Sequence, residues 1–325
     1  MALSTVAEAH NTDTLTVFLK KTGQIVDSKD SADFIRTVLP PDPTMDKDLY
    51  RVLEYYPNGK LKAAATSLTK SADVVLDGTY IEYFMSGTRK KTAIFKNGRY
   101  NGFETEYYPN GKIYDIVEIK DFNDRYNPGI RPGSINNYTV QIVELRDSTG
   151  KLLVNHGTGH VLIFDDDFKK VIEEGDIKNY KSEGEWRGLI ADSGRFIITF
   201  HKNEFKSGIS YMKSGHHYTF KNVSEMAVFS EGQSAFNSFI KKNLQYPESA
   251  RKRKISGSVR IAFDVETDGT LSHLKVERGL MKSMDDEALR VISLSPLWYP
   301  ATNYGAPIKS HRFVVVDFYY DPYNY

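Results

Sequence analysis

Hydrophobic and polar residues alternate most clearly near the C-terminal end of the chain. Every second position is apolar at Val259, Ile261, Phe263 and Val265. A period of two predicts a strand with one buried face, because successive side chains of a strand point to opposite sides. The strand is expected to end at Thr267-Asp268-Gly269-Thr270, since Asp-Gly is typical of a hairpin turn. The sequence therefore predicts two antiparallel strands, the second over residues 271–279.

Helical periodicity flanks these two strands. An apolar stripe with helical spacing is formed by Phe236, Phe239, Ile240 and Leu244. A short second helix is expected after Tyr246-Pro247, and a third one before Pro296, which cannot continue a helix. The apolar run 311–320 predicts a closing strand. Together these elements predict an α+β domain over residues 234–325, with helices packed on one face of a small antiparallel sheet.

A repeat precedes this domain. The hexapeptide Tyr-Tyr-Pro-Asn-Gly-Lys occurs at residues 55–60 and again at 107–112, and a degenerate copy begins at Tyr83. Each copy follows a strand-like segment, and Asn-Gly is typical of a tight type I′ hairpin turn. The spacing predicts a mainly antiparallel β meander over residues 49–225. A loop seam is expected at 121–138, where Pro and Gly cluster.

The first 48 residues are expected to form a tail, one hairpin and a linker. The alternating run at 14–26 predicts the hairpin, and the three prolines within 39–46 break any regular element that follows. Residues 1–10 lack the basic and leucine-rich parts of an intact signal peptide. No stretch of the sequence reaches the roughly 18 apolar residues that a membrane helix needs, so no membrane span is expected.

The repeats resemble MORN-type repeats, in the bacterial variant with Tyr-Tyr-x-Asn-Gly-Lys. Tyr suits cross-strand packing and Gly suits turns, so a structural role in a stacked sheet is the main expectation. The alternative is an aromatic strip presented to a partner or a glycan. The motif positions are Tyr55, Tyr56, Asn58, Gly59, Tyr107, Tyr108, Asn110 and Gly111.

The C-terminal part resembles the TonB C-terminal domain family over residues 234–320. The resemblance rests on six ordered sequence runs, whose motif residues include Tyr246, Pro247, Gly257, Asp268, Gly269, Trp298 and Pro300. The family implies that the module adds an extended peptide of an outer-membrane receptor as a strand to an open sheet edge. By resemblance, this edge is formed by Phe313, Val314, Val315, Val316 and Phe318. The alternatives are that this strand only builds the core, or that it pairs with a second copy to form a homodimer.

Composition and charge narrow the classes of partner. The chain has 43 Lys and Arg against 42 Asp and Glu, a net charge of +1, so no nucleic-acid partner is expected. The absence of Cys excludes disulfides and thiolate metal sites. The densest basic run is Arg251, Lys252, Arg253 and Lys254. A solvated helix face is the main expectation for it, and contact with an anionic cell-wall polymer or lipid head groups is the alternative.

The sequence contains no recognisable catalytic or metal-binding motif. Residues 264–269 begin like an EF-hand loop, but position twelve is Lys275 instead of a bidentate Glu, so a hairpin turn is expected. The acidic run 165–167 is expected to be a solvated turn. The pairs His156/His160 and His216/His217 have no carboxylate in ligand spacing. No nucleophile elbow, phosphate loop or dinucleotide fingerprint is present, so we expect no enzyme, no metal and no cofactor.

These observations predict a non-enzymatic adaptor of the cell envelope. The family resemblance implies the periplasm of a Gram-negative bacterium and a protein partner, either an outer-membrane receptor or another envelope or transport protein. A full energy transducer carries a membrane helix and a Pro-rich spacer, and neither occurs in this sequence. Binding is therefore expected more than energy transduction. The alternative is a cytoplasmic antitoxin-like or scaffold protein whose repeats bind a partner and whose C-terminal module dimerises.

Overall fold

The computed structural model describes residues 13–44, 46–119, 140–191 and 193–320. The expected tail at 1–10 and the expected seam at 121–138 lie outside the described residues. The chain divides into two compact units. The N-terminal unit consists of Met1–Trp186 and Phe200–Glu204, and the C-terminal unit consists of Arg187–Thr199 and Phe205–Tyr325. Each unit is described by itself below.

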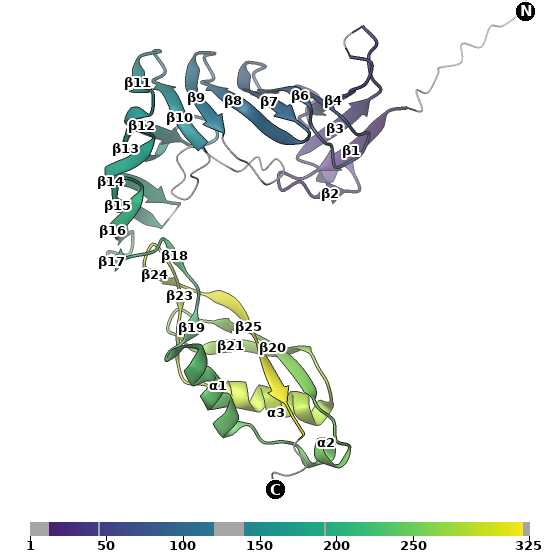
Figure 1. Ribbon diagram of the computed structural model, residues 1–325, viewed down its shortest axis with the longest axis vertical. Helices are drawn as coiled ribbons and strands as arrows, with labels where there is room; N and C mark the ends of the chain where they lie inside the picture. Colours follow the sequence, from purple (N-terminus) through teal and green to yellow (C-terminus); the bar gives the residue numbers. More distant parts are fainter. Residues whose placement is uncertain (1–12, 45, 120–139, 192, 321–325) are drawn as a thin grey trace, which may run out of the picture. The chain divides into compact units, whose positions relative to one another are not determined.

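The N-terminal unit is an antiparallel meander (Figure 1). Its strands are β1 (Leu15–Leu19), β2 (Ile25–Val26), β3 (Phe34–Leu39), β4 (Tyr50–Tyr55), β5 (Leu61–Ser67), β6 (Gly78–Tyr83), β7 (Arg89–Lys96), β8 (Arg99–Tyr107), β9 (Ile113–Ile119), β10 (Val140–Arg146), β11 (Leu152–Asn155), β12 (Thr158–Phe164) and β13 (Val171–Lys178). A single 3₁₀ turn, Lys29–Ser31, precedes β3. From β3 to β13 each strand pairs antiparallel with the next.

The start of the meander contains more sheet than the sequence predicted. The expected hairpin is present as β1 and β2, which pair through Phe18 and Leu19. The same two residues also pair with β3, so β1 has a partner on both sides. Strand β3 lies in the segment assigned to a linker, and it connects the first hairpin to the repeats through its pairing with β4.

The turns of the repeat motif are not the type I′ turns that the sequence suggested. In both full copies the loop has three residues, and only its glycine, Gly59 or Gly111, has a positive φ, of 82° or 83°. The N–H of Tyr56 donates to the Lys60 carbonyl at 2.8 Å, and the N–H of Gly59 donates to the Tyr56 carbonyl at 2.8 Å. This is a type I turn followed by a glycine bulge. A pair of positive φ values occurs instead at Asn97-Gly98, the link between β7 and β8.

Charged side chains lie inside the N-terminal unit. Lys91 is buried and lies 2.9 Å from carboxylate oxygens of both Glu104 and Glu106. Burial by itself lowers the pKa of the Lys91 ammonium, but the two carboxylates outweigh it and raise that pKa well above its usual value. Asp115 is also buried, and burial together with Glu106 and Glu104 raises the pKa of its carboxyl group well above the usual range. One amine therefore holds an acidic cluster together.

The C-terminal unit combines three helices with small sheets (Figure 1). Its helices are α1 (Gly232–Asn243), α2 (Glu248–Lys252) and α3 (Lys282–Ser293). Its main sheet has the order β21-β20-β25, formed by Leu271–Arg278, Gly257–Val265 and Ser310–Phe318. Shorter pairs are β19 (Val228–Phe229) with β22 (Trp298–Tyr299), and β18 (Ser224–Glu225) with β23 (Ala301–Asn303) and β24 (Ala306–Ile308). Strand β16 (Glu204–Met212) pairs with β17 (His217–Phe220).

The division between the two units runs through three strands. These are β14 (Lys181–Ile190), β15 (Gly194–His201) and β16 (Glu204–Met212), each of which has residues in both units. Within the C-terminal unit, the alternation predicted for β20 is confirmed, because Val259, Ile261, Phe263 and Val265 are fully buried.

The core of the C-terminal unit lies between the main sheet and the helices. The buried face of β20 packs with Phe236 of α1, with Met284 and Ala288 of α3, and with Val316 and Phe318 of β25. Trp298 joins this core, and its ring centroid lies 5.2 Å from that of Phe263 and 5.7 Å from that of Phe236. Such edge-to-face pairs contribute about 0.5–1.5 kcal/mol each beyond their buried area. The predicted α+β class, a β meander followed by helices on a small antiparallel sheet, is confirmed.

Candidate functional site

The strand β25 forms one edge of the main sheet. In the described part of the chain it pairs with β20 alone, from Gly257 opposite Phe318 to Val265 opposite Ser310, without any register shift. One side of β25 therefore carries main-chain groups that no other strand of the sheet uses. Such a side is a template for pairing with another extended segment.

The direction of each N–H along β25 follows from a contact at its end. The N–H of Tyr320 donates to the Ser256 hydroxyl at 2.9 Å, which lies on the side of β20. Because N–H directions alternate along a strand, those of Phe318, Val316 and Val314 point toward β20 as well. The N–H groups of Val315 and Phe313 then point to the open side. The open edge thus offers donors and acceptors at every second residue.

The five residues predicted for the edge divide between the two faces of the sheet. Val316 and Phe318 are buried in the core, and Val314 packs against it. Phe313 and Val315 are 52% and 48% exposed, on the face opposite the helices. The inner side chains of β25 thus build the core, while its outer side chains and open main chain remain accessible. A peptide-binding role for this edge stays a prediction.

The outer face beside the open edge is structured by β20. The guanidinium of Arg260 lies 3.5 Å from the ring centroid of Phe313, and its cation–π contact holds that exposed ring in place. Arg260 also forms an ion pair with Glu277 of β21 at 2.5 Å. Ser258 donates a hydrogen bond of 2.5 Å to the Asp317 carboxylate. These contacts orient the side chains that a peptide on the edge would touch.

The motif residues that carry the family resemblance build the fold and lie away from the edge's open side. The hydroxyl of Tyr246 donates to the Ile255 carbonyl, and its ring packs against Phe318 at 6.1 Å. Pro247 directly precedes α2 with a φ of −63°. Gly257 begins β20, where a Cβ atom would lie 2.7 Å from the Leu280 side chain.

The remaining motif residues connect the β20–β21 hairpin to the core. The Asp268 carboxylate accepts hydrogen bonds from the N–H and the hydroxyl of Thr270, at 2.9 and 2.6 Å. Gly269 has a φ of 86°, and the N–H of Trp298 donates to its carbonyl at 2.9 Å. A Cβ atom on Gly269 would lie 2.2 Å from the Trp298 carbonyl oxygen. Pro300 separates β22 from β23 and is half-buried.

The basic run lies at the end of α2. Lys252, Arg253 and Lys254 are exposed, while Arg251 is half-buried. Lys252 forms an i,i+4 ion pair with Glu248 at 3.1 Å, and such surface pairs contribute little to stability. A role for this run in binding an anionic polymer stays a prediction.

The repeat motif connects successive hairpins. The hydroxyl of Tyr56 donates to the Tyr83 carbonyl at 2.8 Å, and the Lys60 amine donates to the Met85 carbonyl at 3.0 Å. In the second copy, the hydroxyl of Tyr108 donates to the Arg146 carbonyl at 2.8 Å, and the Lys112 amine donates to the Thr149 carbonyl at 2.7 Å. The degenerate copy has Phe84 and Thr88 at these positions. It therefore lacks the tyrosine hydroxyl and the long lysine amine that bond to the next hairpin.

The other motif positions shape each turn. The side-chain oxygens of Asn58 and Asn110 accept the N–H of the lysine two residues later, at 3.1 and 3.0 Å. A glutamate also precedes the aromatic pair in the first full copy and in the degenerate copy. Glu54 contacts Lys62 at 2.8 Å and Glu82 contacts Lys90 at 3.5 Å, both eight residues apart. Sequence reasoning missed this ion pair, although its spacing is visible in two copies.

A cavity of about 1280 Å³ lies within the N-terminal unit. Tyr56 and Phe84, the second aromatic residue in two copies of the motif, line this cavity and are half-buried. Three charged side chains that line the cavity form ion pairs with one another, since Arg36 and Lys62 both contact the Glu54 carboxylate at 2.8 Å. Burial raises the pKa of Glu54, but Lys62 and Arg36 outweigh it and hold that pKa below its usual value. The presentation of an aromatic strip to a glycan stays a prediction.

Of the histidines singled out in the sequence, His156 lies in the β11–β12 turn and His160 lies on β12. His216 and His217 lie at the β16–β17 hairpin. The sequence has no carboxylate in ligand spacing beside His160, but the tertiary structure brings two carboxylates next to it. Its Nδ1 lies 2.7 Å from Asp176 and its Nε2 lies 3.8 Å from Glu174, because β12 and β13 bring residues sixteen apart into register. His216 lies 3.1 Å from the Ser214 hydroxyl. The run 165–167 is at the β12–β13 turn, where Asp165 accepts the Lys169 N–H at 2.7 Å.

The hairpin expected at the EF-hand-like segment is present as the β20–β21 turn. The same hairpin brings together three groups that the sequence did not connect. Asp264, Glu266 and His273 each offer one ligand atom within 4.8 Å of the other two. None of the helices in the described residues combines the length and the apolarity that a membrane span needs.

Comparisons with known families agree with these two parts of the chain. Residues 242–320 match the model of the Gram-negative bacterial TonB protein C-terminal domain. Residues 51–66 and 101–121 match the model of the MORN repeat variant. Both resemblances stated from the sequence are confirmed, in the stated order along the chain. No curated protein and no solved structure matches the chain.

Proposed function

We propose that this protein is a non-enzymatic adaptor of the cell envelope whose C-terminal module captures an extended peptide. The peptide adds as a strand to the open side of β25, and it belongs to an outer-membrane receptor or a related transport protein. The observation that carries the proposal is the edge itself. Among the residues that the structure describes, β25 pairs on one side only, over nine residues, in a domain that matches the TonB C-terminal family.

Main-chain and side-chain groups have separate roles in this proposal. The N–H groups of Phe313 and Val315 supply hydrogen bonds that any extended peptide can accept, so they provide affinity. The exposed side chains of the same residues contact alternate side chains of the peptide and provide selectivity. Both residues are apolar, so the peptide is expected to place apolar side chains on that face.

Location and activity follow from the matched families. The TonB C-terminal family is associated with the Gram-negative envelope, which supports a periplasmic location. Neither matched family is enzymatic, and the proposal assigns no catalytic residue. The repeats serve as a scaffold in this proposal, because the recurring Tyr and Lys of the motif bond to the next hairpin.

The test compares the full chain with two variants at one position. Val315→Pro removes an N–H from the open side, whereas Val315→Thr keeps that N–H and the β-branched shape. Circular dichroism establishes that each variant is folded. The three proteins then serve as bait in envelope extract, and the retained proteins are identified by mass spectrometry. We expect the wild type and Val315→Thr to retain an outer-membrane receptor that Val315→Pro does not retain.

Two outcomes contradict the proposal. One is equal retention of the receptor by all three proteins, which places the contact elsewhere. The other is a wild type that is dimeric by light scattering and retains no envelope protein, together with a monomeric Val315→Pro variant. In that case the open edge pairs with a second copy of this chain.

A further inference from the structure

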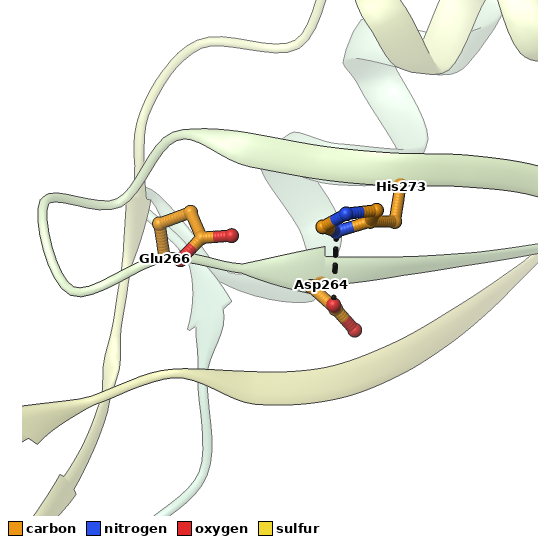
Figure 2. Close-up of side chains that lie close together, drawn as sticks. All are labelled: Asp264, Glu266 and His273. Atoms are coloured by element: carbon orange, nitrogen blue, oxygen red, sulfur yellow. Dashed lines mark ion pairs between the residues drawn. The ribbon is translucent and has the colours of Figure 1, made fainter.

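A cluster of metal-ligating side chains lies on the outer face of the C-terminal sheet, opposite the helices. Figure 2 shows Asp264 on β20, Glu266 just beyond the end of this strand, and His273 on β21, with the ion pair between Asp264 and His273 drawn as a dashed line. A fourth side chain, that of His311, comes from β25. The cluster thus collects two carboxylates and two imidazoles from three neighbouring strands and one turn.

The distances within the cluster are short. The Nδ1 atom of His273 lies 3.2 Å from Oδ2 of Asp264, and the Nδ1 atom of His311 lies 2.9 Å from Oδ1 of the same carboxylate. One oxygen of Glu266 lies within 4.8 Å of ligand atoms of both Asp264 and His273. Ligands around a tetrahedral zinc ion with bonds of about 2.0–2.1 Å are roughly 3.3 Å apart. The two separations between the imidazoles and the Asp264 carboxylate are close to that value.

The backbone holds the ligands in place. Asp264 lies on the central strand, opposite His311 on one side and Ser272 on the other. His273 has a φ of 53°, at the point where the pairing of β20 and β21 shifts register. This irregularity accompanies an outward-facing His273, which is exposed, while its neighbour Leu274 packs on the core. Asp264 and His311 therefore occupy regularly paired strand positions, His273 lies at the register shift, and Glu266 lies at the turn.

A lysine ammonium lies against both carboxylates. The Nζ atom of Lys309 is 2.7 Å from Oε1 of Glu266 and 3.2 Å from Oδ2 of Asp264. The hydroxyl of Ser272 also donates to Glu266 and lies 3.0 Å from Nδ1 of His273. Lys309 shows that a cation is favoured here, and it competes with any other cation.

We infer that this outer face binds a transition-metal ion of the Zn²⁺ class through two carboxylates and two imidazoles, those of Asp264, Glu266, His273 and His311. Neutral imidazoles favour Zn²⁺, Cu²⁺ and Ni²⁺ over Mg²⁺ and Ca²⁺, which prefer oxygen ligands alone. When the metal ion binds, it displaces the long, partly exposed side chain of Lys309 from the two carboxylates. The ion then neutralises the negative charge that the Lys309 ammonium neutralised before. The inference does not depend on the proposed peptide partner.

The test is a calorimetric titration of the full chain with Zn²⁺. His273→Asn removes one imidazole and keeps a residue that tolerates a positive φ, and His311→Gln removes the other. We expect each variant to bind Zn²⁺ about tenfold or more weakly. Lys309→Met removes the competing charge at similar size, and it is expected to tighten binding by about tenfold or more. With Cu²⁺ as the probe, electron paramagnetic resonance is expected to show two coordinated nitrogens in the wild type and one in His273→Asn.

The matched control is His216→Asn, which removes an exposed histidine of the same unit that lies outside the cluster. It is expected to leave the affinity unchanged. The inference is overturned if His216→Asn and His273→Asn weaken binding equally, because the metal then binds surface histidines without preference. It is also overturned if Lys309→Met leaves the affinity unchanged or weakens it. Circular dichroism of each variant separates these outcomes from loss of folding.

Discussion

The hydroxyl of Tyr56 donates a hydrogen bond of 2.8 Å to the main-chain carbonyl of Tyr83, one hairpin further along the meander. The second full copy of the motif makes the equivalent bond from Tyr108 to Arg146. The second tyrosine of the motif therefore connects hairpins that are separate in sequence. This explains why the motif has tyrosine at this position, where phenylalanine would pack equally well.

Removing these hydroxyls is expected to destabilise the N-terminal unit. Tyr56→Phe and Tyr108→Phe should each lower the free energy of unfolding by about 1 kcal/mol, the usual contribution of one hydrogen bond. The chain has two tryptophans, and Trp186 lies in the N-terminal unit. Urea denaturation followed by Trp186 fluorescence in a Trp298→Phe background measures this unit. Tyr55→Phe is the control, since no hydroxyl hydrogen bond of Tyr55 occurs among the described residues; an equal loss there would refute the explanation.

Loss of the buried amine of Lys91 is expected to be far more damaging. Lys91→Met leaves the carboxylates of Glu104 and Glu106 without their shared partner, beside the buried carboxyl group of Asp115. Removing one partner of a buried ion pair lowers the free energy of unfolding by about 3–5 kcal/mol. Lys90→Met is the matched control at the neighbouring residue. The Lys90 amine is partly exposed and its contact with Glu82 is longer, at 3.5 Å. Its loss should therefore cost about 1 kcal/mol or less. Equal losses in the same Trp186 assay would contradict the burial argument.

The carboxyl group of Glu173 is expected to make the stability of the N-terminal unit depend on pH. Burial raises its pKa to about 7, and one of its oxygens has no hydrogen-bond partner among the described residues. The folded state therefore holds a proton that the unfolded state releases near pH 4.5, so stability is lost as the pH rises toward and through 7.

Glu173→Gln removes this titration. The variant should be more stable than the wild type at pH 8 by at most about 3 kcal/mol, and nearly equal to it at pH 4. Urea denaturation at pH 4, 6 and 8 measures the difference in the free energy of unfolding between the two proteins. The histidines are the same in both, so the effect of their titration cancels in this difference. A difference that does not change between pH 4 and pH 8 would rule out the raised pKa of Glu173 as its cause.

Gly269 is expected to be intolerant of any side chain. It has a positive φ, and a Cβ atom there would lie 2.2 Å from the carbonyl oxygen of Trp298. Gly215 has a φ of 89° as well, but open space surrounds the corresponding position. Gly215→Ala should therefore cost about 1–2 kcal/mol for the backbone conformation alone. Gly269→Ala should cost several kcal/mol, because Trp298 and the core behind it must move.

Trp298 fluorescence in a Trp186→Phe background measures both glycine variants, since Gly215, Gly269 and Trp298 lie in the C-terminal unit. Comparable losses from Gly215→Ala and Gly269→Ala would show that conformation alone accounts for the effect. In that case the contact between the hairpin and Trp298 would have no part in the stability of this unit.

Much of the fold could be predicted because its signals are local. The alternation at 259–265, the helical stripe of α1 and the repeated Tyr-Tyr-x-Asn-Gly-Lys each depend on neighbouring residues, and each corresponds to an observed element. The turn type was wrong, because a glycine with a positive φ serves equally in a type I′ turn and in a three-residue loop with a bulge. Strand β3 was missed because its polar positions, such as Arg36, pair with charges on β4.

The candidate sites show the same limit. The sequence alone determined hairpins, helices and a closing strand, which was expected at 311–320 and is observed at Ser310–Phe318. Period and turn residues depend on local backbone geometry, so they can be read from the sequence. Only the tertiary structure decided that β25 has an open side, that His160 lies next to Asp176, and that Asp264 lies between His273 and His311. Strand order and register bring together residues that are far apart in the chain. No local pattern encodes these choices, since they depend on how whole strands share one core.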